Sequence, residues 1–268
     1  MLHICTQLAA GGVSMTSSSE ARDCRPLEAS FDTGGCTDIG LLALASDHAI
    51  ETEMHRMLRS DDIRLHVSRL VSSNTVNMQN LAGIAEGIEA ACSVLLPESS
   101  LSVIAYGCTS GTIAAGEARI LEILKRLKPS CTPTTPITAA RAALDALGIS
   151  SLSVLTPYPR DVHLAVVDHL KNRGLTIVES AYFGVSEDRR ITEIASESLE
   201  AAVDDLSGGD SGVVFVSCTA VTIVDQIAKL ERKTGKTIIT SNQALAWHCL
   251  RLCGLDLKVP GYGRLFEI

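Results

Sequence analysis

Apolar runs and amphipathic stretches alternate along most of this chain. Residues 39–46 form a continuous apolar run, which is typical of a strand buried on both faces. Residues 49–58 then have helical spacing, 63–70 alternate as a strand does, and 74–96 form a long amphipathic helix. Further strands are predicted at 101–107, 151–157, 175–183, 212–217 and 237–241, and further helices at 111–127, 160–174, 189–206, 222–235 and 244–254. This alternation predicts an α/β protein with parallel sheets and helices on both faces.

Two of the predicted strand ends carry the same residues. The segments "VIAYGCTSGTIAA" (103–115) and "VVFVSCTAVTIVD" (213–225) share Val, Cys, Thr, Thr and Ile at matching positions. Cys218 therefore follows Cys108 by 110 positions. Similarity at a fixed distance along a chain is the signature of an internal repeat.

A second pair of strand ends gives almost the same distance. When "IGLLALASD" (39–47) is aligned with the residues around "LSVLTPY" (152–158), Asp47 pairs with Tyr158, 111 positions later. Two independent landmarks with almost the same offset predict a duplicated α/β unit. We expect the two halves to face each other about a pseudo-twofold axis, with the matched cysteines on opposite sides of one cleft.

The domain limits follow from the repeat and from local composition. Residues 1–36 are rich in Ser, Thr and Gly without a clear period, which predicts a flexible N-terminal extension. The first lobe is predicted at 37–148 and is completed by 241–268, and the second lobe at 149–240. The start of the chain is a poor signal peptide, because no Lys or Arg precedes its weak apolar stretch.

Charge and cysteine content narrow the possible partners and the compartment. A net charge of −8 argues against a nucleic-acid or polybasic membrane surface, and no apolar run approaches a membrane-spanning length. Nine cysteines, an odd number without a CxxC pair, fit free thiols in a reducing cytoplasm. Cys249 and Cys253 could share a helix face, but they have no zinc-spaced partner, so we expect core packing and no metal site.

The matched cysteines lie where parallel sheets place ligands. Cys108 and Cys218 each follow a predicted strand and precede a predicted helix. Free N–H groups and the positive end of the helix dipole are expected there, and both favour thiolate and bound anions. Thr109, Ser110 and Thr219 can add hydrogen bonds to a bound substrate. The sequence therefore predicts two cysteines of lowered pKa, whereas the plainer interpretation is that both thiols are buried only for packing.

Two thiols on opposite sides of a substrate suit a limited chemistry. One can remove a proton from carbon while the other returns a proton to the opposite face. Alternatively, one can add to a double bond and later leave. Neither route needs a cofactor, and we expect none.

The motifs "AYGCTSGT", "LTPY", "VSCTA", "SNQALAWHCLRLCG" and "GYGRLF" occur in this order within 38–268. With these motifs the chain resembles the Asp/Glu racemase superfamily, and within it the maleate cis-trans isomerase and arylmalonate decarboxylase group. The most similar subgroup is that of maleate isomerase-like proteins linked to ectoine and hydroxyectoine utilisation. The resemblance implies two flavodoxin-like lobes with a cofactor-free active site between them.

The resemblance also implies roles for individual residues. In maleate isomerases the first-lobe cysteine attacks the alkene, a role that falls on Cys108. The second-lobe cysteine serves in protonation and binding, which falls on Cys218, and the tyrosine of "TPY", here Tyr158, binds a substrate carboxylate. Arylmalonate decarboxylases keep only the second-lobe cysteine, so the presence of both argues against that activity.

The chain departs from the family pattern at two binding positions. Where maleate isomerases have "PSSNTTME", this chain has "LASDHAIE", so Asp47 replaces a carboxylate-binding Asn. A second binding Asn corresponds to Asp188 in "VSEDRRI". Two anionic groups would repel a dicarboxylate. The departure favours a substrate with a cationic or hydrogen-bond-donating group, such as a zwitterionic amino acid or a cyclic amidine of the ectoine type.

Three functions therefore compete at this point. The leading hypothesis is a cofactor-independent isomerase or racemase of a small carboxylic or amino acid-like metabolite, acting as a homo-oligomer such as a dimer. The second is a lyase that decarboxylates a small acid or eliminates water or ammonia. The third is a protein that uses the same cleft to bind a metabolite without turnover.

Overall fold

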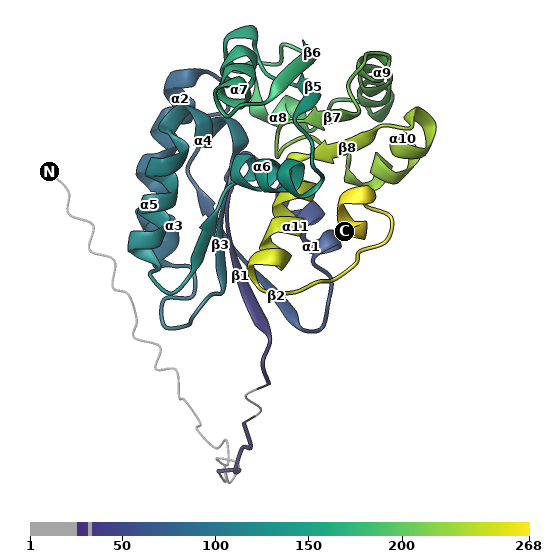
Figure 1. The fold of residues 1–268 in the computed structure, drawn as a ribbon. Coiled ribbons are helices and arrows are strands. Elements are labelled where there is room, and N and C mark those ends of the chain that lie inside the picture. The colour runs from purple at the N-terminus through teal and green to yellow at the C-terminus, as the bar shows by residue number, and fades with distance from the viewer. Residues whose placement is uncertain (1–25, 32–33) are drawn as a thin grey trace, which may run out of the picture. The chain divides into compact units, whose positions relative to one another are not determined.

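Two four-stranded parallel sheets form the frame of the protein (Figure 1). The structure is a computed structural model that describes residues 26–31 and 34–268 of the chain. The first sheet has the order β2-β1-β3-β4 and the second the order β6-β5-β7-β8. The strands are β1 (Thr37–Leu44), β2 (Ile63–Leu70), β3 (Val103–Gly107), β4 (Thr132–Thr134), β5 (Ser151–Thr156), β6 (Thr176–Tyr182), β7 (Val213–Val216) and β8 (Thr237–Thr240). The repeated order is what a duplicated unit predicts, and the predicted α/β class with two sheets is confirmed.

Helices follow the strands and cover the sheets (Figure 1). The α-helices are α1 (Ile50–Met57), α2 (Met78–Gly83), α3 (Ile88–Ser93), α4 (Thr109–Ala115), α5 (Glu117–Leu127), α6 (Pro136–Ala146), α7 (Arg160–Asn172), α8 (Asp188–Ile191), α9 (Ser196–Ser207), α10 (Ile227–Thr234) and α11 (Ser241–Leu252). Three 3₁₀ turns are η1 (Ile84–Gly87), η2 (Val224–Gln226) and η3 (Arg264–Glu267). None of the helices within the described residues is long and apolar enough to cross a membrane.

One strand and one helix were not predicted from the sequence. β4 has only three residues and contains Pro133, so it gives no hydrophobic period, and the small apolar residues of α6 hide its helical pattern. The pair nevertheless has a counterpart in β8 and α11. Thr135 caps α6 and Thr240 caps α11, each by accepting a hydrogen bond from a backbone N–H three residues later. The duplication therefore includes a strand–helix unit that the sequence patterns did not reveal.

Three predicted helices are interrupted, and one of them, 189–206, is divided into α8 and α9. The stretch 74–96 begins its first helix at Met78, where the Asn77 side chain accepts a hydrogen bond from Asn80 N at 2.8 Å, and it then passes through η1 into α3. The stretch 111–127 breaks at Gly116, whose backbone has φ 93° and ψ 117°. Only glycine adopts such angles readily. Because of this break, α4 is a short separate helix that begins directly after Cys108.

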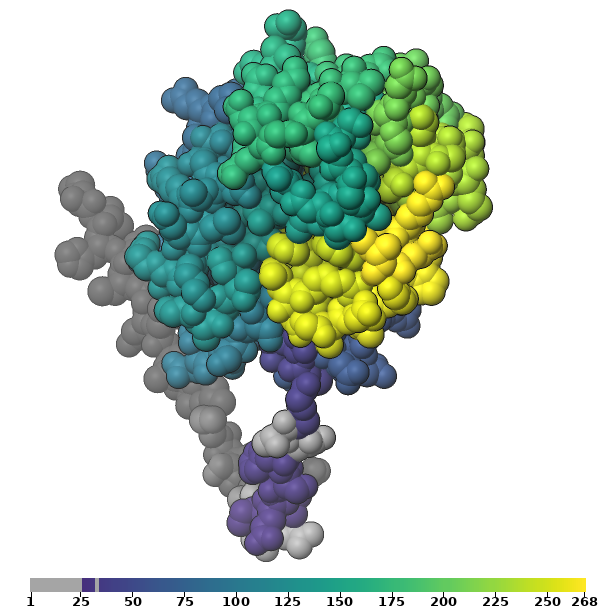
Figure 2. All heavy atoms as spheres, viewed as in Figure 1, coloured from purple at the N-terminus to yellow at the C-terminus, as the bar shows by residue number. Residues whose placement is uncertain are grey.

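The C-terminal helix lies among elements from the first part of the chain. α11 packs against α1, α6, β3 and β4 as well as β8. In the space-filling view the yellow C-terminal segment lies directly against the teal region near α6 and the green second half (Figure 2). These contacts agree with the prediction that 241–268 completes the first lobe, although the lobe limits themselves stay a prediction.

Residues Gly35–Ile268 form one compact unit that holds both sheets and every element named above. The predicted N-terminal extension, 1–36, lies largely outside the described residues. Within the compact unit the central strands β1, β3, β5 and β7 are almost wholly buried. The chain segments that follow these four strands carry the predicted site residues except Asp188, which follows the largely exposed strand β6.

Gly116→Ala should lower the free energy of unfolding by about 1–3 kcal/mol, because an alanine would be strained at this backbone conformation. Gly83→Ala is the matched control, since Gly83 has ordinary helical angles and open space where a Cβ would lie. Urea unfolding followed by circular dichroism measures both variants. Equal stabilities would show that the break between α4 and α5 relaxes without cost.

Candidate functional site

Cys108 directly follows β3 and is the N-cap residue of α4. Its Sγ accepts a hydrogen bond from Gly111 N at 3.2 Å, and the residue is 4% exposed. A Cβ at Gly111 would lie 2.8 Å from this sulfur and 2.9 Å from the Tyr106 hydroxyl. The glycine of the "CTSG" motif therefore leaves room for the thiol, and the predicted position of Cys108 before a helix is confirmed.

Cys218 lies just after β7 but not at the start of a helix. Its Sγ accepts a hydrogen bond from Ala220 N at 3.3 Å, and after a turn at 219–220 the chain stays irregular until η2 begins at Val224. The prediction that a helix N-terminus supports this thiol is wrong. The four consecutive β-branched residues in "AVTIVD" and the tight turn at Ala220 disfavour an α-helix here. The two matched cysteines thus have different local supports.

Ser241, the first residue of α11, joins the two cysteine turns. Its Oγ accepts hydrogen bonds from Thr109 Oγ1 at 2.9 Å and from Cys218 N at 3.1 Å. Thr219 Oγ1 also donates to the carbonyl of Gly107 at 3.4 Å. Each Cys-Thr turn therefore touches the other half of the repeat, as the duplicated arrangement predicts.

Tyr158 is buried and interacts with residues of both turns. Burial raises its pKa well above the usual value, and negative charge on Cys218 or Cys108 would raise it further. The phenol also interacts with the side chain of Ser110, whose Oγ lies 3.9 Å from Cys108 Sγ. The structure thus brings Tyr158, Ser110 and the two cysteines together at one place.

Asp47 uses one carboxylate oxygen to begin α1 and leaves the other free. Its Oδ1 accepts hydrogen bonds from Ala49 N at 2.8 Å and Ile50 N at 2.9 Å. Its Oδ2 is buried without a hydrogen bond of ordinary geometry among the described residues, although the Thr219 hydroxyl lies near enough to lower the carboxyl pKa. Burial has the larger effect and raises the pKa of Asp47. A buried, unpartnered oxygen is well suited to receive a donor from a substrate.

Asp188 lies at the start of α8 and brings a second carboxyl group to the same region. Its Oδ2 accepts a hydrogen bond from Ser46 Oγ at 2.5 Å, and its backbone N donates to Asn74 O at 2.8 Å. Burial raises the pKa of Asp188, and the charge of Asp47 raises it further. Asp47 and Asp188 both lie near enough to the two cysteines to raise the thiol pKa values, while their role as site residues stays a prediction.

The predicted lowering of the thiol pKa values is wrong. Burial raises the pKa of Cys108 to about 12, the Gly111 N–H opposes this, and the charges of Asp188 and Asp47 add to it. Burial likewise raises the pKa of Cys218 well above its usual value. The sequence indicated the N–H donors, which lower a thiol pKa, but it did not show the loss of water around both sulfurs. This loss raises the thiol pKa values by more than the donors lower them.

Sequence reasoning missed three residues that support the site: Ser241, Asn242 and Glu53. Asn242 and Glu53 are buried and hydrogen-bonded to each other, and Asn242 also binds the carbonyl of Thr219. A signal for Glu53 was present, because it lies on the apolar face of α1 beside Ile50, Met54 and Met57. A carboxylate on such a face needs buried partners.

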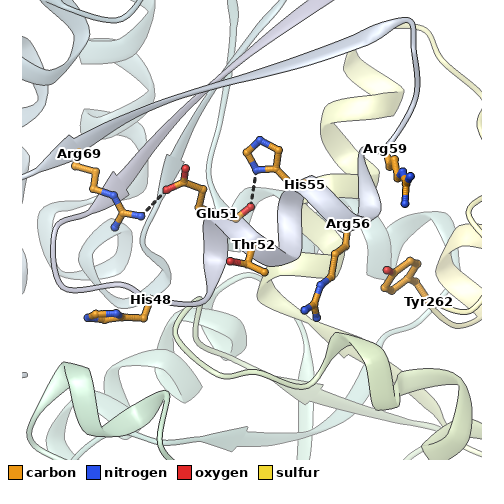
Figure 3. Close-up of a pocket in the computed structure, with 8 residues that line it drawn as sticks. All are labelled: His48, Glu51, Thr52, His55, Arg56, Arg59, Arg69 and Tyr262. Carbon is orange, nitrogen blue, oxygen red and sulfur yellow. Dashed lines mark hydrogen bonds and ion pairs between the residues drawn. The ribbon is translucent and has the colours of Figure 1, made fainter.

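A surface pocket of about 500 Å³ lies on the outer side of α1 (Figure 3). His48, Arg56, Arg59 and Tyr262 line it, with Arg69 joined to Glu51 Oε2 at 2.5 Å. Neither predicted catalytic thiol lines this pocket, so it is distinct from the buried cysteine site. Across residues 26–31 and 34–268, no group of three or more His, Cys, Asp or Glu side chains is placed to hold a metal ion.

The chain is similar in sequence to known enzymes. The sequence profile of the family described as arylmalonate decarboxylase matches residues 40–266. The maleate isomerase of Alcaligenes faecalis is 24% identical over 244 residues, covering 85% of this chain and 96% of that protein. The arylmalonate decarboxylase of Bordetella bronchiseptica is 27% identical over 183 residues, covering 64% and 74%.

A solved structure adds support for the fold. A mutant of the Nocardia farcinica maleate cis-trans isomerase, with a covalently bound succinylcysteine intermediate, matches with a TM-score of 0.81 and 23% identity. The match covers 87% of this chain and 98% of that one. The resemblance to the maleate isomerase and arylmalonate decarboxylase group is confirmed, while the ectoine-linked subgroup stays a prediction. The isomerases among these relatives support an isomerase-type enzyme.

Alkylation by iodoacetamide should leave Cys108 and Cys218 nearly unreacted at pH 8 while partly exposed Cys36 reacts at least about 10²-fold faster, because alkylation proceeds through an accessible thiolate. The rate at Cys108 should still rise with pH up to 10, since its pKa is about 12. Peptide mass spectrometry gives the rate at each cysteine. A plateau at Cys108 below pH 9 would restore the low-pKa interpretation.

Proposed function

The chain belongs to the arylmalonate decarboxylase family, and on that premise we propose that it is a cofactor-independent isomerase of a small carboxylic or amino acid-like metabolite. The reaction is carried by Cys108 and Cys218 in a cleft between the two halves of the repeat. The observation that supports it most is the pair of cysteine turns joined through Ser241, with Tyr158 interacting with residues of both. Two thiols held together in this way can act on one substrate.

In the proposed cis-trans reaction, Cys108 forms a bond from sulfur to one alkene carbon. The thiol of Cys218 gives its proton to the other carbon, so the double bond becomes a single bond about which the adduct rotates. Cys218 thiolate then takes a proton back, the double bond forms again, and the Cys108 sulfur leaves as thiolate. The balance is one substrate converted to its isomer with both cysteines restored.

This route requires Cys108 to lose its proton before attack. The raised thiol pKa makes that loss unfavourable in the buried site, so a nearby base is needed. Asp47 and Asp188 are the proposed acceptors, because their own raised pKa values make their carboxylates stronger bases than exposed ones. A racemisation would use the same groups, with one thiol removing a proton from carbon and the other returning one.

The two acidic side chains also indicate the substrate class. An amino group or amidine entering the site would pair with the unpartnered Oδ2 of Asp47 and relieve its repulsion with Asp188. Tyr158 and Ser110 can donate to a carboxylate. The hydroxyl protons of Thr109 and Thr219 are already donated to Ser241 and to the Gly107 carbonyl, so these residues would have to give up those bonds to do the same. A zwitterionic amino acid or an ectoine-type amidine therefore fits better than a dicarboxylate.

A lyase is the second candidate, because the family is described by a decarboxylase and one relative above carries that activity. Cys218 is the cysteine at which such a reaction would protonate carbon. Product analysis separates the candidates, since an isomerase returns a product of unchanged composition and a lyase releases carbon dioxide, water or ammonia. A protein that only binds metabolites would give neither.

Cys108→Ala and Cys218→Ala should each lower turnover by at least about 10²-fold, because each removes a proposed nucleophile or acid. The assay is a panel of amino acids, alkenoates and ectoine derivatives in deuterated water, read by mass spectrometry and NMR for isomeric product and deuterium uptake. Cys92→Ala is the control, since it removes a buried thiol of α3 outside the site. Near-normal turnover by either site variant would exclude the two-thiol mechanism.

Asp47→Asn should weaken the native substrate by about 1.5–3 kcal/mol through loss of a charge-assisted contact, and should improve binding of maleate. The fold should persist, because the Asn oxygen can still accept the backbone N–H groups of Ala49 and Ile50. Steady-state kinetics with the native substrate and competition by maleate test this. Unchanged kinetics with no gain for maleate would mean that Asp47 only begins the helix.

A further inference from the structure

Glu53 is a carboxylate on the buried face of α1, and it is 3% exposed. Its Oε1 accepts hydrogen bonds from Ile223 N at 3.1 Å and Val224 N at 3.4 Å. Its Oε2 accepts one from Asn242 Nδ2 at 2.7 Å. Every hydrogen-bond partner described for Glu53 is therefore a donor, which suits an ionised carboxylate and leaves no acceptor for a carboxyl proton.

Asn242 links Glu53 to the turn that directly follows Cys218. The same Nδ2 donates to the carbonyl of Thr219 at 2.7 Å, while its Oδ1 is buried without a partner among the described residues. The amide nitrogen must face Glu53 and Thr219, because both offer oxygen acceptors. Glu53 and Asn242 together thus hold the chain at both ends of the stretch from 219 to 224.

We propose that Glu53 is a proton-sensitive positioning residue that fixes the 219–224 turn, and with it Cys218, only when its carboxyl group is ionised. A protonated Glu53 needs an acceptor for its O–H. The unpartnered Oδ1 of Asn242 becomes that acceptor when the amide turns over by half a rotation. The carbonyl of Thr219 then faces an oxygen in place of a nitrogen, so the contact that holds the turn is lost. The catalytic consequence rests on the function proposed above, whereas the change in the turn does not.

The environment of Glu53 places this change near neutral pH. Burial raises its pKa to about 7 and the charge of Asp47 adds to this, while Asn242 and the two backbone N–H groups oppose it. Other ionisable groups around it are His48 before α1, Arg56 on α1, Asp225 on η2 paired with Arg56, and Tyr262 near the C-terminus. The turn is therefore held above pH 7 and released below it.

Water can reach this carboxyl group from the surface. Glu53 lines a pocket of about 340 Å³ together with His48, Arg56, Ile223 and Asp225. Protons can exchange there without opening the cysteine site. Because the folded pKa lies above 4.5, the folded state binds more protons than the unfolded chain between pH 4.5 and 7, so this residue makes stability fall as pH rises through that range.

Hydrogen–deuterium exchange of the 219–224 peptide between pH 5.5 and 8.5, corrected for intrinsic rates, tests the proposal without a substrate. Wild type should gain at least about tenfold protection with a midpoint near pH 7. Glu53→Gln should stay poorly protected at every pH, because a neutral side chain mimics the protonated acid. Glu231→Gln is the control, since Glu231 is also a buried acid that accepts two backbone N–H groups, but on α10 and away from Thr219.

Turnover gives the second readout once a substrate is known. The acidic limb of the kcat profile near pH 7 should disappear in Glu53→Gln, with kcat at pH 8 lowered to the wild-type value at pH 6. A merely structural role would lower kcat at all pH values and keep the limb.

A third measurement covers the case in which Glu53→Gln does not fold. Asn242→Ala should then remove the protection step while Glu53 remains in place. A wild-type peptide without a step, or a step that persists in Glu53→Gln or Asn242→Ala, overturns the switch. Absence of turnover with a preserved exchange step would count against the proposed function alone.

Discussion

The hydroxyl of Ser241 is the interaction on which the arrangement of the site depends. It accepts hydrogen bonds from Thr109 in one half of the repeat and from the backbone of Cys218 in the other. Ser241 is itself fixed, because Thr240 and Gln243 form a reciprocal cap at the start of α11. A helix that packs mainly against α6 and α1 therefore sets the position of a cysteine turn that follows a strand of the second sheet. Loss of this helix start would separate the two thiols without touching either one.

Burial is the second constraint, and it acts on every ionisable group of the site in the same direction. It raises the pKa values of Cys108, Tyr158 and Asp47, so the neutral form of each group is more favoured in the site than it would be in water. A substrate with its own positive charge would change this balance by stabilising the carboxylates. Ionised groups would then form when the substrate binds, and no thiolate would be present beforehand. Acidic residues at positions 47 and 188 and high thiol pKa values are both consistent with this sequence, in which substrate binding comes before loss of the thiol proton.

The sequence predicted the strands and helices that have long, clear hydrophobic patterns. It failed to predict elements whose patterns are short. Buried runs such as 39–46 indicated central strands, and matched Cys-Thr turns indicated two sheets that meet. β4 was missed because three residues with a proline give no period. The thiol pKa values were wrong because a sequence shows which N–H groups lie near a sulfur but not how much water is excluded. Glu53 was missed because its partners lie about 170 and 189 positions away along the chain.

Duplication has produced two cysteine turns that are alike in sequence and unlike in support. Cys108 caps a helix and its sulfur receives an N–H from Gly111, a contact that would persist if the sulfur became negative. Cys218 lies in a turn that is not directly followed by a helix. The carbonyl of the next residue, Thr219, accepts a hydrogen bond from Asn242, which also donates to the buried carboxylate of Glu53. The first turn is therefore rigid and suited to a sulfur that carries charge. The second depends on a contact that protonation can break, so its geometry can respond to conditions. The unequal supports give a physical reason for the unequal roles proposed for two residues that the repeat alone would make equivalent.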